Sequence, residues 1–116
     1  MKTILIVDDM EEQRALIALV LEKKFRIIHA SSGNEALNVL SMNNEIDLIV
    51  SDLEMPDGDG RFLLSSIHKY KKLPVIIVTG NNVITDEELK NVGAVSVLRK
   101  PYDVNSLLAT INEFVV

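Results

Sequence analysis

Five short apolar runs, separated by stretches with helical spacing, constrain the fold of this 116-residue chain more than any other feature. Most of the runs are rich in valine and isoleucine, which suit buried strands. They are almost continuously apolar instead of alternating, which indicates parallel strands covered on both faces. The predicted strands are Thr3–Val7, Phe25–Ala30, Ile46–Ser51, Val75–Thr79 and Val95–Arg99.

Apolar residues at helical spacing follow each predicted strand. Serine, threonine and aspartate precede several of these segments, as helix-capping residues do, and glycine ends one of them. Helix N-caps are expected at Ser32 with Glu35, at Thr85 with Glu88, and at Asp103. Gly93 is expected to end the fourth helix. The expected buried faces comprise Leu16, Ile17, Val20 and Leu21 near 11–23; Ala36, Leu37 and Leu40; Leu63, Leu64 and Ile67 within about 61–70; Leu89 and Val92; and Val104, Leu107, Leu108 and Ile111.

The alternation of strand and helix, repeated five times, predicts an α/β fold. We expect one five-stranded parallel sheet with helices on both faces, and the leading topology at this length is the flavodoxin-like strand order 2-1-3-4-5. Residues 1–116 are expected to form a single domain with no output domain, because no linker or repeat interrupts the pattern.

Composition excludes several classes of protein. The chain has no cysteine, which rules out a disulfide framework, a zinc ribbon and a thiol nucleophile. No apolar run approaches the roughly 18 residues of a membrane span. The formal charge of -5 argues against direct nucleic-acid binding. We therefore expect a cytoplasmic protein that contacts neither a membrane nor nucleic acid.

The negative charge is concentrated in two short windows, residues 8–12 and 52–59. They hold eight of the 17 acidic residues and none of the 12 basic ones. In the expected topology, both windows lie where ligands bind, at the carboxyl ends of the first and third strands. Asp8, Asp9 and Asp52 would meet there, and carboxylates at close quarters need a cation or a proton. Oxygen ligands without histidine or cysteine favour Mg²⁺.

Two further polar residues are expected at the same edge. Thr79 ends the fourth strand, and Lys100 follows the fifth. A hydroxyl and an ammonium group beside a metal-loaded carboxylate can hold an oxyanion such as a phosphoryl group. A carboxylate can itself be the nucleophile in phosphoryl transfer and form an acyl phosphate.

The sequence resembles the receiver domain of two-component response regulators, including the free-standing chemotaxis type. The resemblance runs from residue 6 to 102, and its motifs are specific jointly and in order. They are Ile6-Val7-Asp8-Asp9, Ser51-Asp52, Met55-Pro56-Asp57-Gly58-Asp59-Gly60, Val78-Thr79-Gly80, Gly93-Ala94 and Lys100-Pro101-Tyr102.

The resemblance implies a role for each site residue. Asp52 would accept a phosphoryl group from the phosphohistidine of a histidine kinase or histidine phosphotransfer protein. Asp9 would bind Mg²⁺ directly, with Mn²⁺ as a substitute, while Asp8 would assist and the backbone carbonyl of Glu54 would complete the metal site. Thr79 and Lys100 would bind the phosphoryl oxygens. The Lys100–Pro101 peptide is expected to be cis.

The resemblance also implies a signalling switch instead of a metabolic enzyme. The domain would catalyse its own phosphorylation and dephosphorylation, and its surface of helix 4, strand 5 and helix 5 would rearrange. That surface would act on a downstream protein or a fused output domain that the sequence does not name. One departure bears on this switch, because Val97 stands where the family usually has tyrosine or phenylalanine.

Three alternatives fit less well. A small phosphohydrolase with an aspartyl-phosphate intermediate would carry an Asp-x-Asp pattern on the first strand, whereas Asp8 and Asp9 are adjacent. An FMN carrier would need a phosphate loop rich in serine, threonine and glycine after that strand. An inactive receiver used only for docking would lack an acid, the threonine or the lysine, and none is missing.

Overall fold

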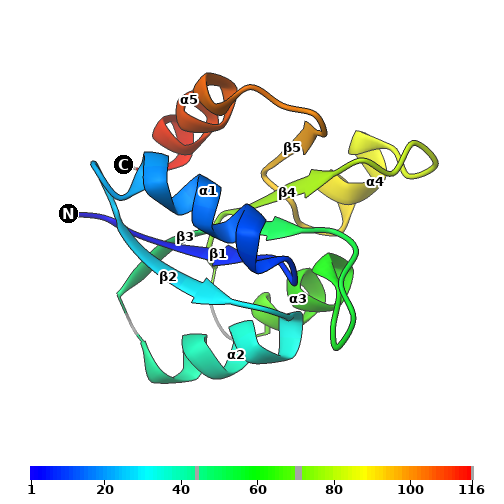
Figure 1. Ribbon diagram of the computed structural model, residues 1–116. Helices are drawn as coiled ribbons and strands as arrows, with labels where there is room; N and C mark the ends of the chain where they lie inside the picture. The colour runs from blue at the N-terminus through cyan, green and yellow to red at the C-terminus, as the bar shows by residue number, and fades with distance from the viewer. Residues whose placement is uncertain (44, 70–71, 116) are drawn as a thin grey trace.

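A computed structural model describes residues 1–43, 45–69 and 72–115. These residues form five strands and five helices that alternate along the chain (Figure 1). The elements are β1 (Thr3–Val7), α1 (Glu11–Leu21), β2 (Arg26–Ala30), α2 (Gly33–Met42), β3 (Ile46–Asp52), α3 (Gly60–Ile67), β4 (Val75–Thr79), α4 (Asp86–Asn91), β5 (Ser96–Arg99) and α5 (Val104–Phe114).

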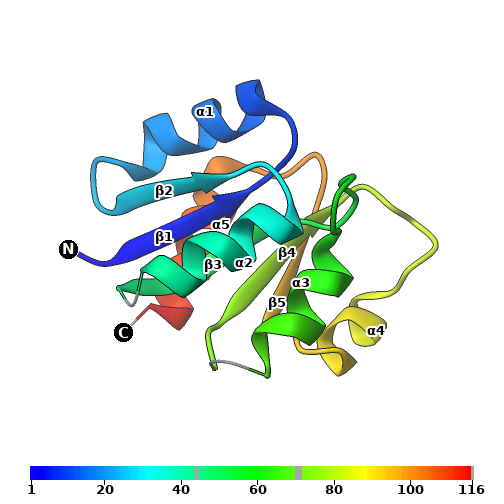
Figure 2. The same cartoon turned by 90° about the horizontal axis from the view of Figure 1, so that it is seen from below.

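The five strands form one parallel sheet in the order β2-β1-β3-β4-β5, which confirms the predicted topology (Figure 2). Neighbouring strands end almost level with one another. Val7 of β1 pairs with Ser51 of β3, and Asp52 pairs with Val78 of β4. This register brings the residues that follow the strands to one edge of the sheet.

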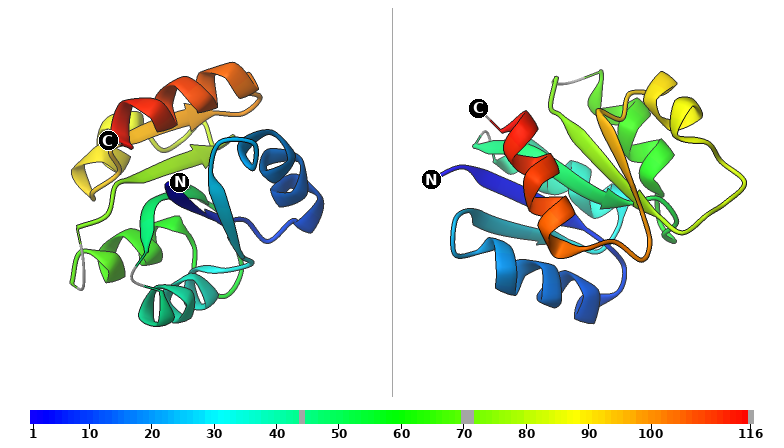
Figure 3. Two further views of the ribbon diagram at one scale, coloured as in Figure 1. Left: turned by 90° about the vertical axis from the view of Figure 1, so that its left-hand side faces the viewer. Right: turned by 90° about the horizontal axis from the view of Figure 1, so that it is seen from above.

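Helices cover both faces of the sheet, as the apolar strands predicted (Figure 3). Helices α1 and α5 pack on one face through Ala18, Leu21, Leu107 and Ile111. Helices α2, α3 and α4 contribute to the core on the other face. Strands β1 and β4 are buried along their whole length, whereas the outer strands β2 and β5 are partly exposed.

The predicted strands are confirmed to within one residue at either end. Helix boundaries differ more, because fraying ends carry no strong sequence signal. Helix α1 ends at Leu21, two residues before the predicted limit, and α3 runs from Gly60 to Ile67 instead of 61–70. The last residue predicted for α3, residue 70, lies outside the described part of the chain.

Three side chains predicted to be buried are exposed: Leu16 by 66 %, Val92 by 48 % and Val104 by 39 %. Successive helix residues are about 100° apart, so Leu16 lies on the opposite side of α1 from the buried Ala18. Val92 is the C-cap of α4 and lies beyond its last turn, while Val104 opens α5 at the solvent edge.

The predicted caps are largely confirmed. Thr85 and Glu88 form a reciprocal capping box, and Asp103 accepts a hydrogen bond from the Asn105 amide. Ser32 accepts from the Glu35 amide at 3.0 Å, but the Glu35 carboxylate accepts from Ser31 Oγ instead of completing the box. Gly93 ends α4 with φ of 120°, and the Lys100–Pro101 peptide is cis as expected.

Candidate functional site

The predicted site residues lie at the carboxyl ends of four neighbouring strands. Asp8 and Asp9 follow β1, Asp52 ends β3, Thr79 ends β4, and Lys100 follows β5. Each strand is held in register by its neighbours, and every one of these residues lies within two positions of a strand end, so the sheet determines where they lie.

Asp8, Asp9 and Asp52 each offer a carboxylate oxygen within 4.8 Å of those of the other two. Asp8 is buried, Asp52 is partly buried and Asp9 is exposed, so the group opens to solvent on one side. Magnesium holds oxygen ligands at about 2.1 Å and retains several waters, so two ligands on one ion lie up to about 4.2 Å apart. The all-oxygen donor set therefore fits Mg²⁺, and carboxylate oxygens at the upper limit of 4.8 Å would have to approach slightly to share one ion.

The Asp52 carboxylate is held by two donors. Its Oδ1 atom accepts a hydrogen bond from the Leu53 amide at 3.0 Å and lies 3.3 Å from Lys100 Nζ. Burial raises the pKa of Asp52 above its ordinary value, the Lys100 charge opposes that shift, and the Asp8 charge adds to it. Lys100 thus favours the ionised form of Asp52, which a nucleophile requires.

Asp8 is the most enclosed member of the group, 4 % exposed. Burial raises its pKa, and the neighbouring Asp9 charge acts in the same direction. A hydrogen bond from the Met10 amide to Oδ1, 2.9 Å long, and the Lys100 charge oppose the shift. A buried carboxylate beside two others is the arrangement that a divalent cation would stabilise.

The Thr79 carbonyl accepts a hydrogen bond from the Lys100 amide at 2.9 Å, but among the described residues the side chains of Thr79 and Glu54 make no hydrogen bond to another site side chain. Thr79 is 1 % exposed, and its Oγ1 accepts from the Asn81 amide at 3.0 Å. Its hydroxyl hydrogen remains available for a further acceptor. Glu54 is exposed in the turn after β3, and its carbonyl stays a prediction as a metal ligand.

Two arginines beside the site were missed by the sequence interpretation. The Arg14 guanidinium of α1 donates to the backbone carbonyl of Asp8, which holds the start of the β1–α1 turn. Arg99, at the end of β5, bonds to the loop that follows Thr79. A sequence signal existed for Arg99, because an arginine in a largely apolar strand needs acceptors nearby.

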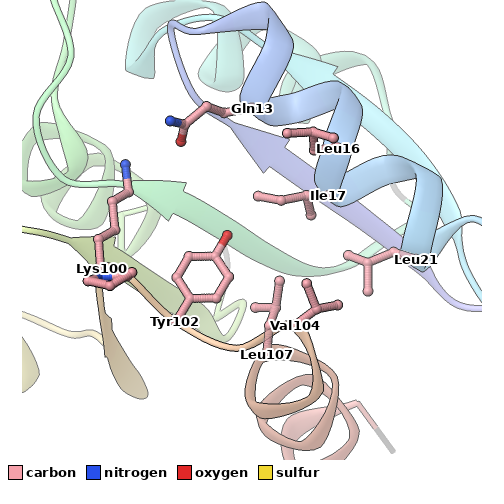
Figure 4. Close-up of a pocket in the computed structure, with 9 residues that line it drawn as sticks. Gln13, Leu16, Ile17, Leu21, Lys100, Tyr102, Val104 and Leu107 are labelled. Atoms are coloured by element: carbon pink, nitrogen blue, oxygen red, sulfur yellow. The ribbon is translucent and has the colours of Figure 1, made fainter.

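Tyr102 lies between the clustered carboxylates (Asp8, Asp9 and Asp52) and an adjacent pocket. The pocket, about 490 Å³, lies between α1 and α5 and is mainly apolar, with Lys100 and Tyr102 among its lining residues (Figure 4). Burial raises the pKa of Tyr102, and the Asp8 and Asp52 charges add to this shift. Tyr102 was part of the sequence motif, but no role had been predicted for it.

None of the described helices has the length and apolar character needed to cross a membrane. Val97, the departure noted in the sequence, is half-buried in β5 beside Ile77 of β4 and packs against the core. It presents no hydrogen-bonding group to the site.

Several curated proteins are similar to this chain. A probable transcriptional regulator, ycf29 of Pyropia yezoensis, is 34 % identical over 119 residues, covering 98 % of this chain and 53 % of the relative. The response regulator GtcR of Aneurinibacillus migulanus is 38 % identical over 112 residues, covering 95 % of this chain and 46 % of the relative. The chain thus spans about half the length of these two relatives.

Solved structures share the fold over nearly the whole chain. A response regulator receiver domain from Clostridium thermocellum superposes with a TM-score of 0.93 at 31 % identity, covering 99 % of this chain and 94 % of the other. The response regulator TrrA from Thermotoga maritima, in complex with Mg(2+)-BeF, superposes with a TM-score of 0.87 at 29 % identity. The match covers 98 % of this chain and 99 % of the TrrA chain.

The family model described as "response regulator receiver domain" matches residues 4–112, which include the acid group, Thr79 and Lys100. With the strand order, the clustered acids and the relatives above, this match confirms the resemblance seen in the sequence. The chain therefore belongs to the response regulator receiver domain family and is a signalling switch of two-component systems.

Proposed function

We propose that Asp52 is the phosphoryl acceptor of this receiver domain and that phosphorylation occurs with Mg²⁺ bound to Asp8, Asp9, Asp52 and the carbonyl of Glu54. The observation that carries the proposal is the ion pair of Asp52 with Lys100 beside two further carboxylates. The phosphodonor is the phosphohistidine of a histidine kinase or histidine phosphotransfer protein, as the family implies. A cytoplasmic location and a single-domain chain also stay predictions.

In the forward step an Asp52 carboxylate oxygen attacks phosphorus, and the bond from phosphorus to the donor's imidazole nitrogen breaks. The imidazole nitrogen keeps the electron pair and is neutralised by a proton from water. Magnesium supplies positive charge that offsets the repulsion between the carboxylates and the phosphoryl oxygens. Lys100 and Thr79 would donate hydrogen bonds to those oxygens, because both are donors at the same strand edge.

The second reaction is hydrolysis of the acyl phosphate, which removes the phosphoryl group by a different route from the one that added it. Water attacks phosphorus, the Asp52 oxygen leaves as carboxylate, and inorganic phosphate is released. The site is open to solvent on the side of the exposed Asp9, so water can enter. We therefore propose that the domain also catalyses its own dephosphorylation, which returns the switch to its resting state.

The decisive experiment is incubation with a small acyl phosphate and MgCl₂, followed by intact mass spectrometry. We expect one added phosphoryl group in wild type and none in Asp52→Asn. Asp59→Asn is the matched control: Asp59 belongs to the same acidic window and caps α3, and asparagine preserves a cap. An equal adduct on Asp52→Asn, or none on wild type, would contradict the proposal.

A further inference from the structure

Arg99 ties the end of β5 to the loop between β4 and α4, residues 80–85 (the β4–α4 loop). Its guanidinium donates to the backbone carbonyls of Asn81 and Ile84, the latter at 2.7 Å. It also bonds to Asp86 Oδ1, from Nη2 at 2.6 Å and from Nε at 2.9 Å. Asp86 is the first residue of α4, which lies beside β5 (Figure 1). One side chain therefore holds both ends of the loop.

The same loop begins at the functional site. The Asn81 amide donates to Thr79 Oγ1 at 3.0 Å, while the Asn81 carbonyl accepts from Arg99. The Asn81 side chain stiffens the turn between them, since its Oδ1 accepts from the Val83 amide at 2.8 Å. A continuous chain of hydrogen bonds thus runs from Thr79 through Asn81 to Arg99 and ends at Asp86.

Val97, two residues earlier in β5, cannot make such a connection. It is an apolar side chain packed against the core. A guanidinium group, in contrast, is a rigid planar fork that fixes several acceptors relative to one another. Among the residues that the structure describes, Arg99 is the β5 side chain bonded to the β4–α4 loop.

Exposure indicates that these bonds serve geometry more than stability. The Arg99 side chain is 34 % exposed and that of Asp86 is 52 % exposed. Ion pairs that water reaches contribute little to the free energy of unfolding. Their arrangement nevertheless fixes where the loop and the first turn of α4 lie relative to β5.

We propose that Arg99 is a positioning residue that couples the state of Asp52 to helix α4. This inference rests on the proposed function, in which Thr79 donates to a phosphoryl group on Asp52. When the Thr79 hydroxyl turns to that new acceptor, the Asn81 amide bonded to it shifts. The Asn81 carbonyl then moves against Arg99, and the rigid guanidinium passes the displacement to Ile84 and Asp86.

The test compares hydrogen exchange of backbone amides over residues 81–91 before and after treatment with a small acyl phosphate and Mg²⁺. Arg99→Gln removes the guanidinium donors and the charge. Arg99→Lys keeps the charge but loses the planar arrangement of guanidinium donors. Asp86→Ala removes the hydrogen bonds between Arg99 and the first residue of α4 without altering Arg99 itself. Arg26→Gln is the matched control, since Arg26 forms an exposed pair with Glu45 at 3.2 Å.

In wild type and Arg26→Gln, phosphorylation should change the rate of hydrogen exchange at the amides of residues 81–91 by about tenfold. In Arg99→Gln the unmodified protein should already exchange about tenfold faster there, and phosphorylation should change it little further. Arg99→Lys and Asp86→Ala should resemble Arg99→Gln. Phosphoryl incorporation, measured by intact mass, should stay within about twofold of wild type in every variant, because phosphorylation takes place at Asp52.

Two results would overturn the inference: unchanged exchange in unmodified Arg99→Gln, or a wild-type response to phosphorylation in that variant. A merely structural role would speed exchange but leave the size of the phosphorylation response unaltered. If wild type takes up no phosphoryl group, the proposed function fails and the coupling fails with it. Exchange in the unmodified proteins would still decide whether Arg99 restrains the loop.

Discussion

Lys100 reaches across the end of β4 to place its ammonium nitrogen 3.3 Å from Oδ1 of Asp52. The Asp52 side chain is 13 % exposed and that of Lys100 is 30 % exposed, so water screens their attraction only in part. This ion pair links the end of β3 to the residue that follows β5. It also favours the ionised form of Asp52, because the Lys100 charge lowers the pKa of that carboxyl group.

Removal of the Lys100 charge should raise the pKa of Asp52. Burial already raises this pKa, and Lys100 is the largest of the influences that lower it. In Lys100→Gln the charge and part of the hydrogen bonding are lost, so protonation of Asp52 should begin at a higher pH. A ¹³C titration of the carboxyl carbons measures this shift.

The matched control for this titration is Lys90→Gln on the exposed side of α4. It removes the same charge away from the strand ends and should leave the Asp52 titration unchanged. A pKa of Asp52 that is equal to or lower than wild type in Lys100→Gln would contradict the assigned electrostatics.

The buried Asp8 carboxylate should make the metal-free protein less stable as the pH rises. Its pKa is raised above the ordinary aspartate value of 3.8, mainly by burial. The native state therefore binds the proton more tightly than the unfolded chain does. That contribution to stability is fully present below the unfolded pKa and is lost as the pH rises through the folded pKa.

Asp8→Asn cannot ionise, yet it can still accept the hydrogen bond from the Met10 amide. We expect it to be more stable than wild type at pH 7 without metal, because the wild-type carboxylate must be ionised in a buried position. The difference should shrink as the pH falls toward 3.8. Urea unfolding across this range measures it. Glu113→Gln, an exposed acid on α5, should show no such pH trend.

Magnesium should stabilise the folded protein through the acid group. A ligand at a hundred times its Kd that binds only the folded state adds about 2.7 kcal/mol to the free energy of unfolding. Asp9→Asn removes one of the three clustered carboxylates and should abolish most of this gain. Thermal unfolding with and without MgCl₂ measures the effect.

Glu12→Gln is the control for the magnesium experiment, because Glu12 belongs to the same acidic window but lies outside the cluster. It should retain the stabilisation by metal. Equal stabilisation of Asp9→Asn and wild type would show that Asp9 is not a ligand.

The sequence predicted the sheet and the place of the acid group because both follow from local patterns. Runs such as Val75–Thr79 fit only a buried strand, and the ends of parallel strands share one edge. The exposure of Leu16 could not be predicted, since α1 is apolar on more than one side. Periodicity alone does not tell which of these sides faces the sheet.

The hydrogen-bond partners of Arg99 could not be predicted either, although an arginine in an apolar strand signals that acceptors lie nearby. One acceptor is the backbone carbonyl of Asn81, 18 positions earlier, and backbone carbonyls leave no mark in the amino-acid pattern. Asp8, Asp9, Asp52 and Lys100 were predictable for the opposite reason, because their chemistry resides in their side chains. Sequence therefore identifies the charged groups of this site more readily than the loop contacts that hold them.

Gly93 should be among the least replaceable residues of the chain. It ends α4 with φ of 120°, and a Cβ atom there would lie 2.0 Å from the Nε2 atom of His68, the C-cap of α3. Gly93→Ala thus introduces backbone strain of about 1–3 kcal/mol and also requires the exposed His68 ring to turn away. We expect its free energy of unfolding to fall by about 1–3 kcal/mol, mainly through the strain.

The two causes can be separated with a double variant. His68→Ala removes the ring but not the backbone strain, so Gly93→Ala should still destabilise the His68→Ala background by about 1–3 kcal/mol. Gly80→Ala is the control, since its Cβ would meet only the Lys100 Cβ at 3.7 Å. Urea unfolding compares all four proteins with wild type. If Gly93→Ala proves as stable as Gly80→Ala, the left-handed backbone conformation assigned to Gly93 is wrong.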